Sequence, residues 1–383
     1  MNPVRLSRAG LSARCTRWFA ALLGAALLGA CSFGSGRPDP KPLEPIAAPI
    51  TIRPAWNQSI GAVQFPLTVA VNAGVLTVAA SDGSVAAIEA ESGRTIWRMN
   101  VGAKIGAGVG SDGRTVAVVT RDGDLVAIES GQIKWKKPLG VRVATAPLVA
   151  GARVFVLGVD RAVQGFDASD GAKLWQLQRP GDPLTLSQTG VITAYKNTLV
   201  VGQGPRMAGI DPVAASLRWE VPIGSPRGAN EVERLADLIG PALRAGELLC
   251  ARSFQAAVGC VNAERGSVVW TKTTGGTDAV GGDADLLFGA DASDRLNAWR
   301  TPSGDVAWTS EALMFRSLGS PAVVAGSVVV GDSKGTLHWL SREKGEAQAR
   351  VNTDGSAISV PPVVVGGLLI VVTRSGGIFA FRP

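Results

Sequence analysis

Few residues of this 383-residue chain could act as catalysts or bind a metal ion. The chain has one histidine, His338, one tyrosine and four cysteines. A zinc site needs several closely spaced Cys or His ligands, and a catalytic triad needs a serine and an acid tied to the histidine. His338 lies in TLHWL (336–340), which is typical of a strand. We interpret it as structural and expect no catalytic residue and no metal.

Glycine- and aspartate-rich segments do not change this interpretation. The segment GGTDAVGGDAD (275–285) lacks the lysine–serine pair of a phosphate-binding loop. Asp82, Asp122 and Asp332 recur at the hairpin tips, where tight turns favour aspartate, and the sequence around them lacks the alternating acids of a calcium loop. We therefore expect no bound cofactor.

The first thirty residues indicate export. Basic residues precede the apolar run WFAALLGAALLGA (18–30), which is too short to span a bilayer comfortably. Leu28-Gly29-Ala30-Cys31 has the pattern of a lipobox, so residues 1–30 are predicted to be a lipoprotein signal peptide and Cys31 the lipidated N-terminus. An ordinary signal peptide with an incidental cysteine is the alternative. Ser32, in place of an aspartate, favours the outer membrane of a Gram-negative bacterium, on its periplasmic face.

Residues 31–53 are rich in proline and lack periodicity, so we expect an extended tether. The leader contributes four of the 38 basic residues, which leaves 34 against 31 acidic residues. This small excess has no basic cluster interleaved with aromatic residues, and nucleic-acid binding is therefore not expected.

A repeat of about 40 residues covers the rest of the chain. AIEAESGRTIW (87–97), GFDASDGAKLW (165–175) and AWRTPSGDVAW (298–308) are copies of one unit that ends in tryptophan. At fixed repeat positions, tryptophans are expected to be structural and to fill the outer rim between units, rather than to stack on a ligand. These residues are Trp56, Trp97, Trp135, Trp175, Trp219, Trp270 and Trp308, with Ala349 at the next position.

Each unit is predicted to contain four short strands. VLTVAASDGSVAAIE (75–89) is a hairpin with Asp-Gly at its turn; a further apolar run comes before such hairpins, and the tryptophan strand follows. Four strands per repeat predict an all-β, eight-bladed β-propeller of four-stranded antiparallel blades over residues 54–383. The last unit has only three strands, so we expect an N-terminal strand around residues 54–60 to complete it and close the ring.

Cys250 and Cys260 occupy matching positions on the two strands of one hairpin. Aligned repeats place them opposite each other, close enough for a disulfide if strand twist narrows the gap. The periplasm is oxidising, which favours a bond. Two buried free thiols are the alternative.

The unit A-x-[DE]-x-x-[ST]-G-x-x-x-W resembles the repeat of quinoprotein-like propellers. Among these, the chain resembles the BamB family, lipoproteins of the outer-membrane β-barrel assembly machinery, over nearly its whole length. VVVGDSKGTLHWL (328–340) and EVERLADL (231–238) are similar to the family's seventh-blade hairpin and acidic interblade loop. The resemblance implies a non-catalytic scaffold that binds the periplasmic repeats of BamA, with nascent outer-membrane proteins as further candidate partners.

The resemblance also implies which loops bind BamA. Leu184 and Leu186 match two leucines of one loop, and Ser187 stands where the family has a basic residue. Asp237 matches the first acid of the other loop, while Ile239 replaces the second. The remaining candidates lie just upstream and are Glu231 and Arg234.

Repeat spacing supports these two loops independently. Trp175, Trp219 and Trp270 are separated by 44 and 51 residues, the two longest gaps in the repeat. Both insertions connect the outermost strand of one blade to the innermost strand of the next, and such connections emerge on one face. Long loops on one face commonly bind partners; neutral insertions are the alternative. Two functional alternatives also stay open: a small quinoprotein-type or sugar-binding periplasmic enzyme, and an envelope adaptor with another partner.

Overall fold

The described residues form eight antiparallel sheets of four strands each. The structure is a computed structural model in which residues 37–47, 49–179, 184–226 and 228–383 are described. Those residues contain no helix of the length and apolarity needed to cross a bilayer. The predicted signal peptide and Cys31 lie outside the described residues.

Seven sheets each consist of four strands that are consecutive in the chain, and each sheet is one blade. The strands of blades one to four are β2 (Ala70–Asn72), β3 (Val75–Ala79), β4 (Ser84–Glu89), β5 (Thr95–Asn100); β6 (Ile105–Ser111), β7 (Thr115–Thr120), β8 (Asp124–Glu129), β9 (Gln132–Pro138); β10 (Leu148–Ala150), β11 (Arg153–Leu157), β12 (Val163–Asp167), β13 (Lys173–Leu177); β14 (Ile192–Tyr195), β15 (Thr198–Gln203), β16 (Arg206–Ile210) and β17 (Leu217–Pro222). The strands of blades five to seven are β18 (Leu238–Ala245), β19 (Leu248–Ser253), β20 (Ala257–Asn262), β21 (Ser267–Thr273); β22 (Gly281–Gly282), β23 (Leu286–Ala290), β24 (Leu296–Arg300), β25 (Val306–Ser310); β26 (Ala322–Val324), β27 (Ser327–Gly331), β28 (Thr336–Ser341) and β29 (Ala347–Asn352).

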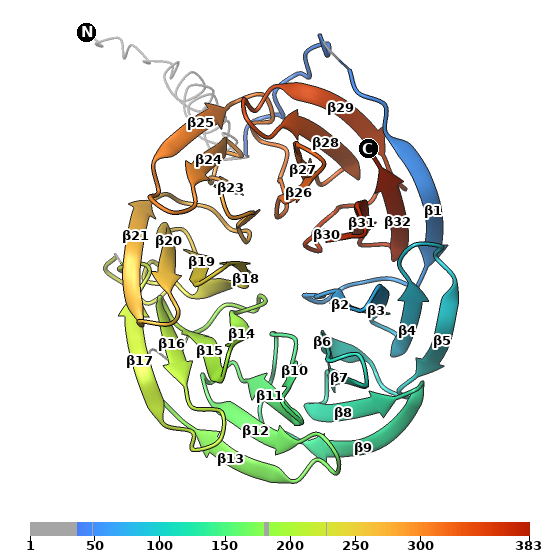
Figure 1. Ribbon diagram of the computed structural model, residues 1–383, viewed down its shortest axis with the longest axis vertical. Coiled ribbons are helices and arrows are strands. Elements are labelled where there is room, and N and C mark those ends of the chain that lie inside the picture. The colour runs from blue at the N-terminus through green and yellow to red at the C-terminus, as the bar shows by residue number, and fades with distance from the viewer. Residues whose placement is uncertain (1–36, 48, 180–183, 227) are drawn as a thin grey trace, which may run out of the picture. The chain divides into compact units, whose positions relative to one another are not determined.

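The eighth blade joins the two ends of the folded chain. Strands β30 (Val363–Val365), β31 (Leu368–Val372) and β32 (Gly377–Arg382) come from the C-terminus, and β1 (Arg53–Ser59) pairs antiparallel with β32 as the outermost strand. Figure 1 shows the resulting ring, with β1 beside β32. The predicted eight-bladed propeller and its closure by an N-terminal strand are confirmed. Because the ring is closed, every blade has a neighbouring blade on both of its faces.

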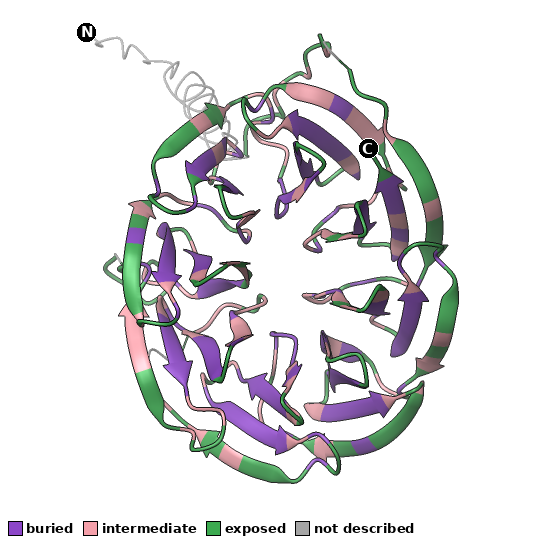
Figure 2. Ribbon diagram, viewed as in Figure 1, coloured by how far each residue is buried: buried purple, intermediate pink, exposed green. Residues whose placement is uncertain are grey.

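The core lies in the two middle strands of each blade. Strand β7 is buried at every residue, as is β27, and both consist of small or β-branched residues apart from one glycine. The outermost strands alternate between exposed and partly buried positions, as Figure 2 shows around the rim of the ring. A blade packs against a neighbour on each face, so its middle strands need apolar residues on both sides.

Alternating strand direction sorts the turns of every blade onto two faces. The turns between first and second strands, and between third and fourth strands, lie on one face. The turns between second and third strands lie on the other, together with the connections from an outermost strand to the next blade. We call this second face the connection face.

The repeat tryptophans join each blade to the next. Each lies on an outermost strand, and all except Trp175 pack against a glycine in the turn between the third and fourth strands of the following blade; for example, Trp135 packs against Gly171. The indole Nε1 of Trp135 also donates a hydrogen bond of 3.0 Å to the carbonyl of Ala168 in that turn. Equivalent hydrogen bonds to the next blade are made by Trp56, Trp175, Trp270 and Trp308.

Ala349 replaces tryptophan where the receiving turn does not exist. The blade after β29 is the eighth, whose third and fourth strands come from opposite ends of the chain. No turn joins them, so there is no turn glycine for a ring to pack against. Ala349 is buried in a cluster that includes Phe381, and Ile52 packs against this cluster.

A disulfide joins the middle strands of the fifth blade. Cys250 on β19 lies opposite Cys260 on β20, and their sulfur atoms are bonded. Both residues are fully buried, next to Trp270 and Val258.

The proline-rich segment before β1 binds the ring along part of its length. The compact unit begins at Pro40 rather than at residue 54. The amide of Lys41 donates to the carbonyl of Met314 (3.0 Å), and the amide of Ile50 donates to the carbonyl of Gln348 on β29 (3.0 Å). An extended chain has free backbone groups that pair with a strand edge, which composition alone does not reveal. Only the part of the predicted tether before Pro40 lies outside this unit.

The glycine turns provide a test of tryptophan docking. Gly171→Ala places a Cβ atom 2.6 Å from the ring of Trp135 at a φ of +71°, whereas Gly74→Ala has the same strain (φ +77°) with no atom within 4 Å. Both variants should lose about 1 kcal/mol from left-handed strain. Gly171→Ala should lose about 1–3 kcal/mol more, because the ring must move. Urea unfolding measures the difference, and equal losses would show that the docked ring adds nothing.

Candidate functional site

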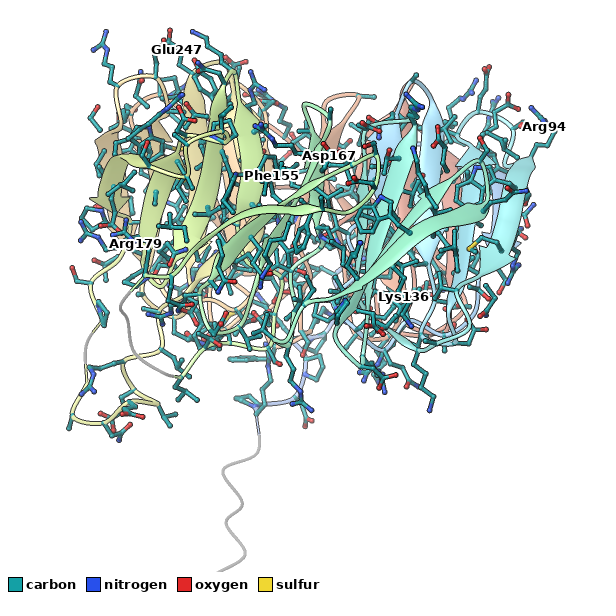
Figure 3. The ribbon with its side chains drawn as sticks, turned by 90° about the horizontal axis from the view of Figure 1, so that it is seen from below. Arg94, Lys136, Phe155, Asp167, Arg179 and Glu247 are labelled. Atoms are coloured by element: carbon teal, nitrogen blue, oxygen red, sulfur yellow. A yellow bond between two sulfur atoms is a disulfide. The ribbon has the colours of Figure 1, made fainter. Side chains whose placement is uncertain are left out.

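The two long connections lie on the connection face and follow neighbouring blades. The first connects β13 to β14 and the second connects β17 to β18. Figure 3 shows the ring from its edge, with Glu247 on one face and Arg179, at the start of the first connection, towards the other. The loop of residues 184–190 is called here the leucine loop, and the loop of residues 229–240 the acidic loop.

Backbone contacts connect these two loops. The amide of Gly240 donates to the carbonyl of Thr189 (2.8 Å), and Gly190 forms an isolated antiparallel bridge with Ile239. Gly240 has no side chain at a point where a Cβ atom would collide with the carbonyl of Gly190. The leucine loop and the acidic loop, about fifty residues apart in the sequence, therefore form one continuous surface.

Asp237 makes the closest side-chain contact between the loops. Its Oδ2 accepts a hydrogen bond from the amide of Leu186 (2.8 Å), and its Oδ1 lies 3.2 Å from Nη2 of Arg161. Arg161 is in the turn between β11 and β12, with φ +65°, and its Nη2 also donates to the carbonyl of Leu184 (3.4 Å). The side chains of Arg161 and Asp237 are only 14% and 15% exposed.

The residues predicted in the leucine loop have different exposures. Leu184 is 37% exposed, Leu186 is partly buried and Ser187 is exposed. Leu186 also lines a small cavity of about 50 Å³ together with Leu238 of the acidic loop. Leu184 thus presents apolar surface to solvent while Leu186 fixes the loop beneath it.

In the acidic loop, the predicted residues lie in two places. Glu231 is exposed and Arg234 is half-buried, both in a turn whose Asn230 carbonyl accepts from the amide of Arg234 (3.2 Å). Asp237 lies at the leucine loop instead. Ile239, which occupies the family's second acidic position, is 5% exposed and contributes to the bridge with Gly190.

Two residues of this surface were missed by the sequence-based prediction. Val232, at the turn of the acidic loop, is 68% exposed; a lone valine among Glu and Asn residues was a signal that could have indicated it. Arg161 gave no such signal, because the sequence separates it from Asp237 by 76 residues.

A larger cavity of about 420 Å³ opens among the innermost segments of several blades. Its lining includes the polar residues Gln64, Ser320 and Ser359 and the charged residues Asp278 and Arg374. Within the described part of the chain, no group of three His, Cys, Asp or Glu side chains is placed to hold a metal ion.

Comparison with a family model and comparison with related proteins indicate the same family. The family model described as "Outer membrane protein assembly factor BamB" matches residues 81–310. A protein of that name from Bordetella pertussis is 33% identical over 388 residues, covering 99% of each chain. The chain belongs to the BamB family. A second BamB, from Burkholderia pseudomallei, is 32% identical and covers 90% of this chain and 91% of its own.

Solved structures share the fold of this BamB-family chain. The crystal structure of BamB from Moraxella catarrhalis has a TM-score of 0.78 at 21% identity and covers 87% of this chain and 100% of that one. Quinohemoprotein alcohol dehydrogenase from Comamonas testosteroni has a TM-score of 0.65 at 16% identity, covering 86% of this chain and 76% of that one. At these identities the likeness concerns the fold, so one propeller serves both an assembly factor and an enzyme.

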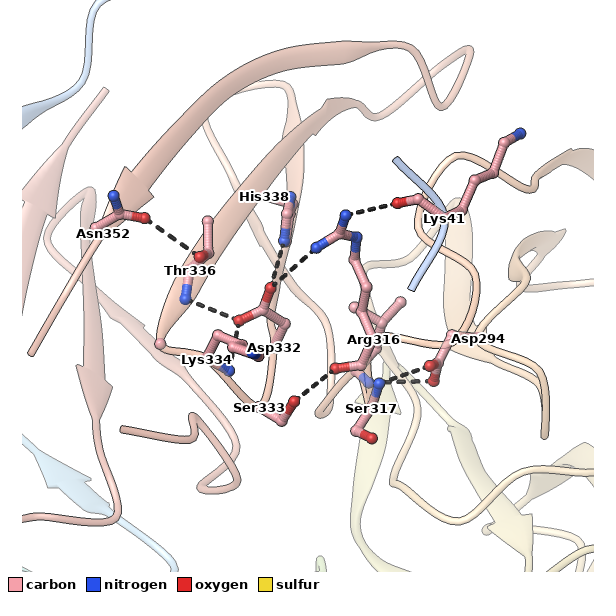
Figure 4. A network of polar contacts seen from close by, with 12 residues as sticks. Lys41, Asp294, Arg316, Ser317, Asp332, Ser333, Lys334, Thr336, His338 and Asn352 are labelled. Atoms are coloured by element: carbon pink, nitrogen blue, oxygen red, sulfur yellow. Dashed lines mark hydrogen bonds and ion pairs between the residues drawn. The ribbon is translucent and has the colours of Figure 1, made fainter. Parts of the chain in front are cut away.

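The lone histidine of this BamB-family chain lies within a polar network in the seventh blade (Figure 4). His338 Nε2 lies 3.0 Å from Oδ2 of Asp332, and both side chains are buried. Oδ1 of Asp332 accepts from the amides of Lys334 and Thr336, at 2.9 Å each. Arg316 lies 3.9 Å from Asp332 and donates to the carbonyl of Lys41 (2.6 Å). The network thus connects a hairpin turn to the N-terminal segment.

Burial raises the pKa of Asp332, but the hydrogen bonds from His338 and from backbone amides outweigh this effect and leave the pKa below its ordinary value. A carboxylate with a lowered folded-state pKa stabilises the fold above its unfolded pKa of about 4, and this contribution is lost as the pH falls through the lowered value.

Replacement of Asp332 by Asn should therefore cost about 1–3 kcal/mol at pH 7, because buried hydrogen bonds to a charged group are lost. The difference from wild type should persist down to about pH 4 and shrink below it. Urea unfolding between pH 7 and pH 3 measures this. Asp82→Asn is the matched control, since Asp82 takes the same turn position in the first blade but is exposed and should matter little. A pH-independent difference would contradict the assigned role.

Proposed function

We propose that this chain is a non-catalytic, lipid-anchored scaffold of outer-membrane protein assembly that binds BamA through the leucine and acidic loops. The observation that carries the proposal is the exposed Leu184 on a surface that two interblade loops build together. Apolar anchors within a polar surround are typical of the centres of protein interfaces.

Chemistry on the described surface supports binding rather than turnover. The connection face presents Leu184 and Val232, apolar residues 37% and 68% exposed, beside Glu231. His338, the one histidine, is buried and paired with Asp332 away from these loops. A scaffold role is also in keeping with the printed names of the relatives, which are outer membrane protein assembly factors.

BamA is the partner that the family resemblance implies, and nascent outer-membrane proteins are additional candidates. The departures from the family pattern are consistent with a mainly apolar contact. Ser187 carries no charge, and Ile239 is buried where the family has an acid. Affinity in this chain should then depend on the leucines more than on charge pairs across the interface.

Leu184→Ala/Leu186→Ala should weaken binding to the purified periplasmic region of BamA about 30-fold or more, since one lost apolar anchor costs about 2 kcal/mol. Isothermal titration calorimetry measures the change. The matched control is Ile96→Ala/Leu174→Ala, which removes similarly exposed residues (46% and 44%) from outermost strands and should bind like wild type. Unchanged affinity of the leucine variant would exclude this surface as the docking site.

The proposed lipid anchor is tested by fractionation. Cys31→Ala should move the protein from the outer membrane to the soluble periplasm, because the acyl chains supply the membrane affinity. Cys15→Ala is the control. It changes the cysteine inside the predicted signal peptide and should leave the protein in the membrane fraction. Retention of the Cys31→Ala variant in the outer membrane would argue for another means of attachment.

A further inference from the structure

Asp237 is engaged inside the protein rather than directed at a partner. One carboxylate oxygen accepts the amide of Leu186 at 2.8 Å, and the other lies 3.2 Å from Nη2 of Arg161. The side chain is 15% exposed. A partner could reach little of this carboxylate without first breaking its internal contacts.

Arg161 is itself placed between two neighbouring blades. It occupies a left-handed position at the turn between β11 and β12 in the third blade. The Arg161 carbonyl accepts from Nε2 of Gln203 in the fourth blade (3.2 Å). Gly204 lies under the guanidinium, where an added Cβ atom would be 3.3 Å from Nη1. Gly204 also accepts the amide of Leu238 through its carbonyl (2.9 Å).

Both leucines of the leucine loop are held by this ion pair through their backbones. Arg161 donates to the carbonyl of Leu184, and Asp237 accepts from the amide of Leu186. Between them, Thr185 donates its hydroxyl to the carbonyl of Val159 (2.8 Å), in the same turn as Arg161. Three successive residues are therefore fixed to the third blade and the acidic loop.

We propose that Arg161 and Asp237 form a clamp that positions the leucine loop for its partner, so that both act through Leu184 and Leu186. This inference rests on the proposed docking function, and it makes Arg161 a positioning residue for binding. A loop that is ordered before binding does not lose its conformational freedom on association, and its affinity rises accordingly. A direct contact of Asp237 with the partner is the competing explanation.

The test compares Arg161→Gln, Asp237→Asn and the double variant in the full protein. Two quantities are measured: affinity for the periplasmic region of BamA, and hydrogen–deuterium exchange of residues 184–190 in the free protein. Each single variant should bind about 10-fold more weakly and exchange about 10-fold faster in that segment. The double variant should be no weaker than either single variant, because each removes the same clamp.

Two further variants serve as controls. Arg161→Lys keeps the charge but not the forked geometry, and should fall between wild type and Arg161→Gln. Arg218→Gln breaks a comparable pair, with Asp211 at 2.6 Å, in a turn between third and fourth strands on the opposite face. It should leave affinity and loop exchange unchanged. Circular dichroism confirms that each compared variant is folded.

Three results would overturn the clamp. The first is unchanged hydrogen–deuterium exchange of residues 184–190 in both single variants. Asp237→Asn could weaken binding while Arg161→Gln does not, which would assign Asp237 to a direct contact. Additive losses in the double variant would also separate the two roles. Absence of binding by the wild-type protein would instead refute the docking proposal, while exchange in the free protein would still decide whether the clamp orders the loop.

Discussion

The ring depends on a contact between a tryptophan and a turn that lacks side-chain bulk. The blades radiate from the centre of the propeller, so neighbouring blades diverge towards the rim, where a large aromatic ring fills the space between them. Trp135 shows the requirement on both sides: its ring packs against Gly171, and its Nε1 donates to Ala168. The middle strands can then consist of small and β-branched residues, as in β7 and β27. The rest of the fold follows from repeating this contact around the ring.

Closure changes that rule at one position and gives the N-terminal segment a structural role. The eighth blade is assembled from both ends of the folded chain, so it offers no turn to a preceding tryptophan, and Ala349 stands there. Beside this position, Ile50 pairs with Gln348, and Arg316 holds the carbonyl of Lys41. The residues that precede β1 therefore stabilise the part of the ring where the repeat is interrupted.

The proposed docking requires loops that the blades themselves hold in place. Connections of neighbouring blades emerge on one face, where Gly190 can bridge to Ile239 and Asp237 can reach Leu186. Long loops alone would be costly to order on binding. The third and fourth blades reduce that cost through Arg161 and Gly204, which support both loops from below. A rigid disc with tied loops can thus present apolar anchors in a fixed geometry.

The architecture could be predicted from the sequence alone, because the repeat carries its own geometry: hairpin turns, apolar runs and a tryptophan at seven of eight fixed positions predict the blade, and eight copies predict the ring. The same spacing placed Cys250 opposite Cys260 and indicated both long loops. The contacts of Asp237 became known only from the tertiary structure, since Arg161 lies 76 residues away and neither a hairpin-turn residue nor an interblade-loop residue carries a periodic signal. The tertiary structure likewise decided that the proline-rich segment binds the ring from Lys41, because backbone pairing with a strand edge depends on proximity and leaves no mark in composition.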